Sequence, residues 1–323
     1  MSVHAYAAHA AKASLVPFEY EPAPLSDNQV EVAISHCGIC HSDVHLVDGD
    51  WGQVFPVVPG HEIIGVVADG DGIPLGTRVG LGWQCGSCGT CEWCRAGEER
   101  LCPNSQATCM GNYGGFADRI RVDRRFAIPI PASLPSAAAA PLLCAGITVY
   151  TPLREYATAG SRVAVVGIGG LGHLAVRFAA AMGCEVTAVS SHPEKEAEAR
   201  GFGAQRFIVD TPPAGAFDLI LNTAHAALKM DVYLRALRPK GVFCQLGAAP
   251  APLVVSSFGL IAGSKAVVGS AIGSPSAIAE MLDFAATHGI AAQVELMPFE
   301  HCSDAIERTR RNQARYRMVL ARS

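Results

Sequence analysis

Five cysteines lie within eighteen residues of this chain, in the run CGSCGTCEWCRAGEERLC that begins at Cys85 and ends at Cys102. The first four follow one another at intervals of three residues. Two residues between thiols are typical of metal chelation, and four thiolates on a short loop can hold a tetrahedral zinc ion. The spacing alone allows two ligand sets: Cys85, Cys88, Cys91 and Cys94, or Cys88, Cys91, Cys94 and Cys102.

Disulfides and buried free cysteines are the alternatives to a metal in this loop. The N-terminal stretch MSVHAYAAHAAKASLVPFEY has no basic start followed by an apolar core, so we expect no signal peptide and a cytoplasmic protein. A reducing compartment disfavours disulfides, and the loop is too short to pair all its thiols without strain. Free cysteines are often buried, but chance does not explain this spacing, and we predict a structural zinc site.

Composition limits the classes to which the protein can belong. Its 323 residues suggest two domains, and 50% hydrophobic against 17% charged residues predicts a packed core rather than disorder. No apolar stretch reaches the ~18 residues of a membrane span. Lys and Arg number 25 against 29 for Asp and Glu, and a net charge of −4 gives no electrostatic reason to bind nucleic acid or an anionic membrane.

Three further fragments carry residues typical of metal ligands. They are CGICHSDVH at residues 37–45, PGHEIIG with His61 and Glu62, and PLLCAGITVY with Cys144. A cysteine, a histidine and a second cysteine far apart in sequence suit a catalytic zinc, which takes three protein ligands and leaves one position open. Each fragment alone is more typical of a core residue, so this prediction depends on their occurring together with the cysteine loop and a nucleotide motif.

That nucleotide motif follows a short apolar run, residues 162–166, which is typical of a buried parallel strand. The glycine pattern G-x-G-x-x-G consists of Gly167, Ile168, Gly169, Gly170, Leu171 and Gly172. A helical apolar pattern that ends at Gly183 and a second strand at 185–189 complete the context that a dinucleotide-binding motif requires. Its glycines let the backbone approach a pyrophosphate at the helix N-terminus.

The end of the second strand indicates which dinucleotide binds. An acidic residue there would hold the ribose 2′-hydroxyl of NAD, but this chain has Ser190, Ser191 and His192, followed by Glu194 and Lys195. Hydroxyls and a lysine suit a 2′-phosphate, so we predict NADP(H). Glu194 is acidic and close by, and a polar loop without cofactor preference is the alternative.

Strands and helices alternate through the rest of the chain. We predict strands at 217–224, 241–248 and 264–274, and helices at 228–241 and 276–289. The first 145 residues differ, because Pro and Gly recur at short intervals between short β-like runs. The pattern predicts an α/β protein in which an irregular β-rich domain precedes a Rossmann unit.

Together, these fragments resemble the zinc-dependent medium-chain alcohol dehydrogenases, and most closely the cinnamyl-alcohol-dehydrogenase-like group of NADP-dependent aldehyde reductases. The matching stretches follow the family's order through nearly the whole chain: CGICHSDVH, VPGHEIIG, CGSCGTCEWCRAGEERLC, PLLCAGITVY, GIGGLGHLA, LIAGSKAVVGSAIGS, EMLDFAATHGI and ARYRMVL. The resemblance implies a GroES-like catalytic domain with a structural-zinc lobe at 1–147, a doubly wound Rossmann domain that binds NADP at 148–287, and a return segment at 288–323 that completes the catalytic domain.

The resemblance also implies two zinc ions per chain. The catalytic zinc would be bound by Cys40, His61 and Cys144, with Glu62 beside it. The structural zinc would be bound by Cys88, Cys91, Cys94 and Cys102, which leaves Cys85 spare.

The remaining implied roles concern catalysis and cofactor binding. Ser42 would hydrogen-bond the substrate oxygen, His45 would pass the proton toward solvent, and Asp43 would orient His61. The other implied contacts are His41 and Arg317 with the pyrophosphate, Thr148 and Ile272 with the cofactor, Ser190, Ser191, His192 and Lys195 with the 2′-phosphate, and Trp51 and Ile272 with the substrate.

We therefore expect an enzyme that interconverts primary alcohols and aldehydes by hydride transfer with NADP(H), with zinc as Lewis acid. The expected assembly is a homodimer, with a tetramer as the alternative. An NAD-dependent zinc alcohol or polyol dehydrogenase is one alternative function, and a non-catalytic zinc- and nucleotide-binding redox sensor is another. Two loops are shorter than is usual for the family, after GHEIIGVV and between Cys102 and Tyr113, so substrate preference need not follow that of its relatives.

Overall fold

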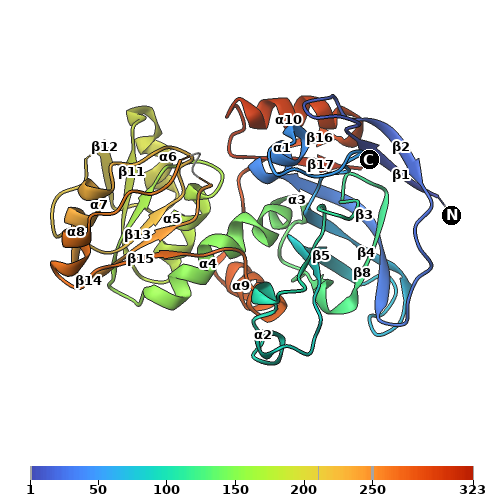
Figure 1. Ribbon diagram of the computed structural model, residues 1–323, viewed down its shortest axis with the longest axis horizontal. Coiled ribbons are helices and arrows are strands. Elements are labelled where there is room, and N and C mark those ends of the chain that lie inside the picture. Colours follow the sequence, from blue (N-terminus) through green and yellow to red (C-terminus); the bar gives the residue numbers. More distant parts are fainter. Residues whose placement is uncertain (1, 210, 249–250, 323) are drawn as a thin grey trace. The chain divides into compact units, whose positions relative to one another are not determined.

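The chain divides into a β-rich unit and a unit in which helices alternate with parallel strands. The structure is a computed structural model that describes residues 2–209, 211–248 and 251–322. One unit comprises Met1–Ile147 and Gly273–Ser323, and the other comprises Thr148–Ile272 (Figure 1). The first division coincides with our expected boundary. The second falls earlier than the expected one after residue 287, because α9 (Pro275–His288) packs with the first unit.

A seven-stranded sheet forms the centre of the first unit. Its order is β16 (Val294–Pro298), β17 (Arg317–Ala321), β3 (Gln29–Ile39), β4 (Glu62–Gly70), β5 (Arg78–Leu81) and β9 (Ile128–Pro129), with β8 (Arg119–Asp123) also paired to β3. A separate hairpin joins β1 (Val3–Ala7) to β2 (Val16–Tyr20). Because β17 pairs antiparallel with β3, the C-terminal segment completes the sheet that the N-terminal residues begin.

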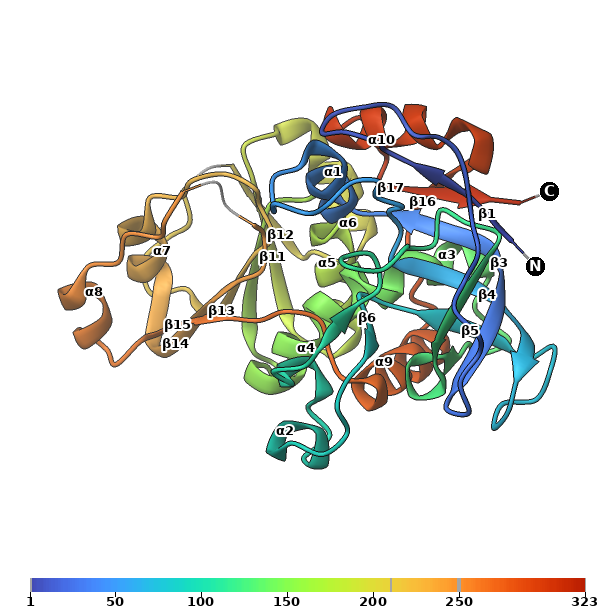
Figure 2. The ribbon, with the colours of Figure 1, turned by 45° about the vertical axis from the view of Figure 1, so that its right-hand side comes forward.

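Short helices flank this sheet. Those that position functional residues are α1 (His41–Asp48), the 3₁₀ helix η3 (Ala140–Leu143) and the start of α4 (Ala145–Tyr156). Further along, α10 (Cys302–Arg310) packs on β16 and β17 (Figure 2). The core between these layers is aliphatic, with Val30, Val32, Ile63 and Val79 fully buried. The β-rich fold expected for this part of the chain is confirmed.

The second unit contains one parallel sheet of six strands. Its order is β12 (Arg206–Val209), β11 (Glu185–Ser190), β10 (Arg162–Val166), β13 (Phe217–Asn222), β14 (Leu237–Gln245) and β15 (Ala266–Gly269). This corresponds to the doubly wound order 3-2-1-4-5-6, in which dinucleotides bind where the strand order reverses. The helices described in this unit are the greater part of α4, from Thr148 on, α5 (Gly172–Ala181), the 3₁₀ helix η4 (Pro193–Lys195), α6 (Glu196–Gly201), α7 (Met230–Ala236) and α8 (Ser257–Ile261). The predicted Rossmann fold is confirmed.

Several predicted elements end earlier in the structure, among them the strands expected at 217–224 and 241–248, which end at Asn222 and Gln245. The helix expected at 228–241 ends at Ala236, because the backbone becomes extended at Leu237 and enters β14 directly. The strand expected at 264–274 is limited to β15, where the parallel partner β14 ends its pairing. Among the described residues no single helix is long and apolar enough to cross a membrane, although the bent pair Ser136–Leu143 and Ala145–Tyr156 passes by length and composition.

Candidate active site

Four buried side chains converge in the first unit. The ligand atoms of Cys40, His61, Glu62 and Cys144 all lie within 4.8 Å of one another. Cys40 is the N-cap of α1, His61 and Glu62 stand at the start of β4, and Cys144 follows η3. Three segments far apart in sequence therefore meet, because β3 and β4 pair side by side and η3 packs against both.

Asp43 joins two of these segments. One carboxylate oxygen, Oδ2, accepts from the backbone N–H of Cys40 at 2.8 Å. The other, Oδ1, accepts from the backbone N–H of Gly60 at 2.8 Å and lies 3.0 Å from Nδ1 of His61. Asp43 thus orients the imidazole ring of His61 through Nδ1. It also holds the backbone of the two segments that carry Cys40 and His61.

The charges of the cluster favour metal binding. A hydrogen bond from Cys144, aided by the positive charges of Arg317 and His61, lowers the pKa of Cys40 well below its usual range. Burial lowers the pKa of His61, but the negative charges of Asp43 and Cys144 outweigh burial and raise it. Nε2 of His61 is buried without a hydrogen-bond partner among the described residues. Two thiols and an imidazole with its inner nitrogen free fit a zinc site with one open position.

Glu62 lies beside these three residues and is paired with Arg317. Its Oε1 accepts from Nη2 of Arg317, and both side chains are almost wholly buried. Burial raises the pKa of Glu62 to about 7, against the lowering effect of the Arg317 charge. A Cβ at Gly38 would overlap Oε2 of Glu62, so the glycine of CGICH leaves the space that this carboxylate fills. The expected contact of Arg317 with a pyrophosphate stays a prediction.

The helix α1 carries the groups expected to handle the proton. Sγ of Cys40 lies 3.7 Å from the hydroxyl of Ser42. One turn further on, Nδ1 of His45 lies 2.7 Å from Oδ2 of Asp50, which is exposed. Trp51 lies against His45, with ring centroids 5.2 Å apart. The structure thus places Ser42 beside Cys40, and His45 between Asp50 and Trp51 further along the same helix and the turn after it.

Two residues near the cluster were missed in the sequence. Trp83 meets His61 edge to face at 4.9 Å and Trp51 at 5.9 Å. Cys109 is buried with Sγ 3.8 Å from Nδ1 of His61. A tryptophan directly after a short strand and before the cysteine run is the signal that could have identified Trp83. Nothing in the sequence pattern singles out Cys109, because it reaches His61 only through the fold of the shortened loop.

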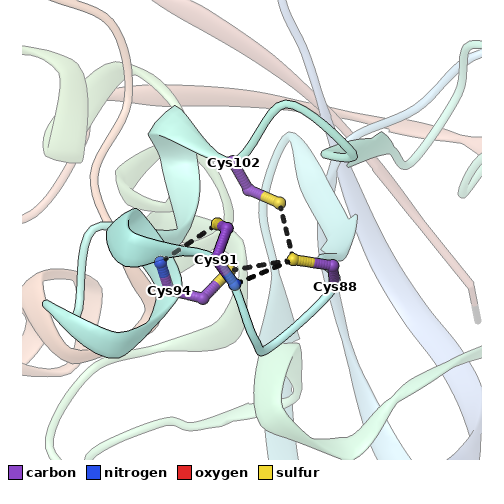
Figure 3. Close-up of side chains that lie close together, drawn as sticks. All are labelled: Cys88, Cys91, Cys94 and Cys102. Carbon is purple, nitrogen blue, oxygen red and sulfur yellow. Dashed lines mark hydrogen bonds between the residues drawn. The ribbon is translucent and has the colours of Figure 1, made fainter.

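A second cysteine cluster lies in the projecting lobe (Figure 3). The four thiols of Cys88, Cys91, Cys94 and Cys102 lie within 4.8 Å of one another. Sγ of Cys88 is 3.5 Å from that of Cys102 and 4.0 Å from that of Cys94. A tetrahedron with Zn–S distances of ~2.3 Å has edges of ~3.8 Å, so these sulfurs fit zinc. Of the two sets that the spacing allows, the geometry brings together this one.

Backbone N–H groups stabilise the thiolate form of a cysteine in this cluster, which is the form that binds a cation. The backbone N–H groups of Thr90 and Cys91 donate to Sγ of Cys88 at 3.5 and 3.4 Å. These donors lower the pKa of Cys88 to about 5. Cys85 stands apart from the cluster, with Sγ against the carbonyl of Gln106 at 3.5 Å, and burial raises its pKa to about 11.

The glycine motif forms the turn between β10 and α5 in the second unit. Gly167 has φ +86 and lies against Ala224, and a Cβ at Gly172 would overlap the carbonyl oxygen of Gly167. A Cβ at Gly169, in contrast, would meet nothing within 4 Å. Two glycines are therefore needed by the turn itself, whereas Gly169 leaves its backbone open to a ligand.

The residues after β11 lie next to this turn. Nζ of Lys195 donates to the carbonyl of Ile168 at 2.7 Å, which brings an ammonium group to the glycine loop. The hydroxyl of Ser190 is buried and accepts from the backbone N–H of His192 at 3.1 Å. Nδ1 of His192 lies 3.0 Å from a carboxylate oxygen of Glu194, and both side chains are mostly exposed.

The other predicted cofactor and substrate contacts stay predictions. Thr148 is buried in the second unit, where the hydroxyl of Thr151 donates to the carbonyl of Ile272 at 3.0 Å. His41 begins α1 in the first unit and is partly buried. Ser191 is exposed at the end of β11.

Comparison with known proteins agrees with this geometry. Residues 26–132 match the model of the alcohol dehydrogenase GroES-like domain, and residues 170–287 match that of the zinc-binding dehydrogenases. The chain is 42% identical to the aldehyde reductase AdhA of Synechocystis, over 99% of both chains. It is similar to the structure of the cinnamyl alcohol dehydrogenase SbCAD4 of Sorghum bicolor, with a TM-score of 0.95, 38% identity and coverage of 99% and 98%. The CAD of Helicobacter pylori, solved as a complex with NADP(H), has a TM-score of 0.92, 29% identity and coverage of 99% and 98%.

Proposed function

This chain belongs to the zinc-binding alcohol dehydrogenases, and we propose that it interconverts primary alcohols and aldehydes by hydride transfer with NADP(H). The observation that carries the proposal is the meeting of Cys40, His61 and Cys144 in one buried cluster beside the hydroxyl of Ser42. A protein that only bound zinc would need no donor set with an open position. This argues against the non-catalytic sensor.

Two zinc ions per chain suit the two clusters. Cys40, His61 and Cys144 would hold a catalytic ion, and Cys88, Cys91, Cys94 and Cys102 would hold a structural one. When bound, the catalytic ion supplies a Lewis acid that polarises the substrate oxygen. Asp43 keeps Nε2 of His61 directed into the cluster by engaging Nδ1.

Ser42 and His45 transfer the proton of the alcohol. Ser42 holds this proton at Oγ, next to the cluster, and gives it up in the oxidative direction. His45 exchanges the proton with solvent, because its ring is partly exposed and its Nδ1 is paired with the exposed carboxylate of Asp50. The indole of Trp51 lies against the ring of His45, with ring centroids 5.2 Å apart, and helps to hold its position.

The choice of NADP(H) is supported by the residues after β11. Lys195 presents its ammonium group at the carbonyl of Ile168, inside the glycine loop. Ser190 ends the strand and Ser191 follows it, where an acidic residue would stand in an NAD-specific protein. The complex of the Helicobacter pylori relative with NADP(H) is consistent with this choice.

The substrate is an aromatic or medium-size aldehyde. The support is the pair of indoles, Trp51 and Trp83, that meet edge to face beside His61. Flat aromatic walls suit an aromatic substrate through offset and edge contacts.

We extend the proposal to a cytoplasmic homodimer. The support is the free edge of the parallel sheet at β15 together with exposed apolar side chains on the preceding segment: Val254 is 83%, Phe258 78% and Ile261 72% exposed. A second copy that paired with β15 would continue the sheet and cover these side chains. A tetramer remains the alternative assembly.

The testing experiment compares initial rates with NADPH and NADH at equal concentration, using cinnamaldehyde as substrate in the presence of zinc. A strong preference for NADPH is expected. A preference for NADH would replace the proposal by the alternative, an NAD-dependent alcohol or polyol dehydrogenase. Absence of turnover across a wide panel of carbonyl compounds, with both zinc ions bound, would overturn the enzymatic function.

A further inference from the structure

Arg125 lies beside the turn that carries the first two cysteines of the lobe. Its Nη2 donates to the carbonyl of Ser87 at 3.0 Å. A Cβ at Gly89 would lie 2.9 Å from Nη1 of Arg125, so the guanidinium packs directly over this glycine. Gly89 has φ +71, a conformation that the turn between Cys88 and Cys91 needs and that glycine adopts readily.

The position of Arg125 is held from the other side by Asp123. Nε lies 3.1 Å from both carboxylate oxygens, and Nη2 lies 2.6 Å from Oδ2. Asp123 itself is nearly buried at the end of β8 and also contacts Nδ2 of Asn28 at 3.4 Å. Because Asp123 ends a strand of the sheet and binds the guanidinium through both carboxylate oxygens, it fixes the orientation of the Arg125 side chain.

The charge of the guanidinium is stabilised by its carboxylate partner. Hydrogen bonds that Arg125 donates to Asp123 raise the pKa of Arg125. A fixed cation is therefore held at the carbonyl of Ser87, the residue directly before Cys88.

Four thiolates around a divalent ion carry a net charge of −2, and a fixed cation beside them offsets part of that charge. We propose that Arg125 is a positioning residue for the structural zinc: it clamps the turn at Ser87 and Gly89 and balances the charge of the four thiolates. The inference rests on the proposed structural zinc. It concerns a residue outside the set of ligands, in the 3₁₀ helix η2 (Arg124–Phe126) that follows β8 of the main sheet.

The test measures zinc release from Arg125→Gln and Arg125→Lys to a chromogenic chelator. Zinc content is measured first, and a Cys144→Ser background isolates the ion held by the lobe. We expect Arg125→Gln to release this ion about tenfold faster than the parent protein, because charge and hydrogen bonds are both lost. Arg125→Lys keeps the charge and should show a smaller increase. The matched control is Arg124→Gln, since Arg124 contacts the carbonyl of Asp27 instead.

Salt separates charge balance from packing alone. Raising the ionic strength from ~0.01 to ~1 M shortens the Debye length from ~30 to ~3 Å, so the difference between the Gln and Lys variants should narrow. Two zinc ions in the parent protein with unchanged release from Arg125→Gln would overturn this inference alone. A parent protein that binds no zinc in the lobe would overturn the structural-zinc assignment and the inference with it.

Discussion

The carboxylate of Asp43 and the imidazole of His61 are both fully buried, and Oδ1 of the former lies 3.0 Å from Nδ1 of the latter. The contact fixes the ring so that Nε2 faces Cys40 and Cys144. A ligand histidine held in this way loses little freedom on binding a metal.

Asp43→Asn should weaken binding of the catalytic zinc by roughly 10- to 100-fold and leave the structural zinc in place. The amide can no longer stabilise the N–H of His61 as a carboxylate does. Metal analysis after dialysis against a graded chelator measures both ions, and Asp71→Asn, at an exposed position, is the control. Equal zinc retention in Asp43→Asn and the parent would contradict the role given to Asp43.

Lys195→Ala should raise the KM for NADPH by about tenfold and leave that for NADH nearly unchanged, because an ion pair with the 2′-phosphate is lost. Steady-state kinetics with both cofactors measures the effect. Lys229→Ala, which removes an exposed lysine elsewhere in the same unit, should change neither value. An equal rise in KM for NADPH and NADH would mean that Lys195 stabilises the glycine loop through Ile168 and does not bind the 2′-phosphate.

Trp83→Ala should lower kcat/KM for cinnamaldehyde by about tenfold, since an aromatic contact of about 1 kcal/mol and buried area are lost. The rate with acetaldehyde should fall less, because this small substrate reaches fewer side chains. Trp93→Ala, on the exposed face of the lobe, is the matched control. Equal losses with both substrates would indicate that Trp83 acts by packing against His61.

Gly169→Ala and Gly172→Ala should separate cofactor binding from folding. A methyl at Gly172 overlaps the carbonyl of Gly167, so we expect a loss of about 2–3 kcal/mol in the free energy of unfolding. A methyl at Gly169 meets no protein atom within 4 Å, so stability should stay within about 0.5 kcal/mol while NADPH binding weakens. Urea unfolding and fluorescence titration measure the two quantities. Unimpaired NADPH binding by Gly169→Ala would argue against this loop as the pyrophosphate site.

Asp123→Asn should destabilise the protein by about 1–2 kcal/mol at neutral pH. Burial raises the pKa of Asp123, but hydrogen bonds from Arg125 outweigh burial and lower it. A lowered pKa in the folded state stabilises the fold above the unfolded pKa of ~3.9, and this contribution is lost as pH falls through the folded value. Urea unfolding of both proteins should therefore give a constant difference between pH 5 and 7 and a smaller one below pH 4. A difference that grows on acidification would contradict this ion pair.

The sequence predicted the nucleotide turn well because the turn is local. The residues of β10, the six-residue motif and α5 are consecutive, and their strand and helix patterns are set by neighbours a few positions away. The boundary of the second unit was harder to predict. The helix α9 has an ordinary capping pattern, with Ser274 before it and Gly289 after it, and nothing in that pattern tells which sheet it packs against.

By itself, the sequence determined the fold class, the cysteine lobe as a metal-type loop, and the family, since each depends on spacing or order along the chain. The spacing left Cys85 and Cys102 as alternative ligands, and the resemblance to the family implied Cys102. Only the tertiary structure brought Trp83 and Cys109 against His61 and set Arg125 beside Gly89. Those relationships join residues of different strands and loops. Trp83 follows β5, which pairs with β4 next to His61, and Arg125 follows β8, which contacts β6 (Gln84–Gly86) just before Gly89. Contacts of this kind depend on which strands pair, and they leave no periodic pattern in the sequence.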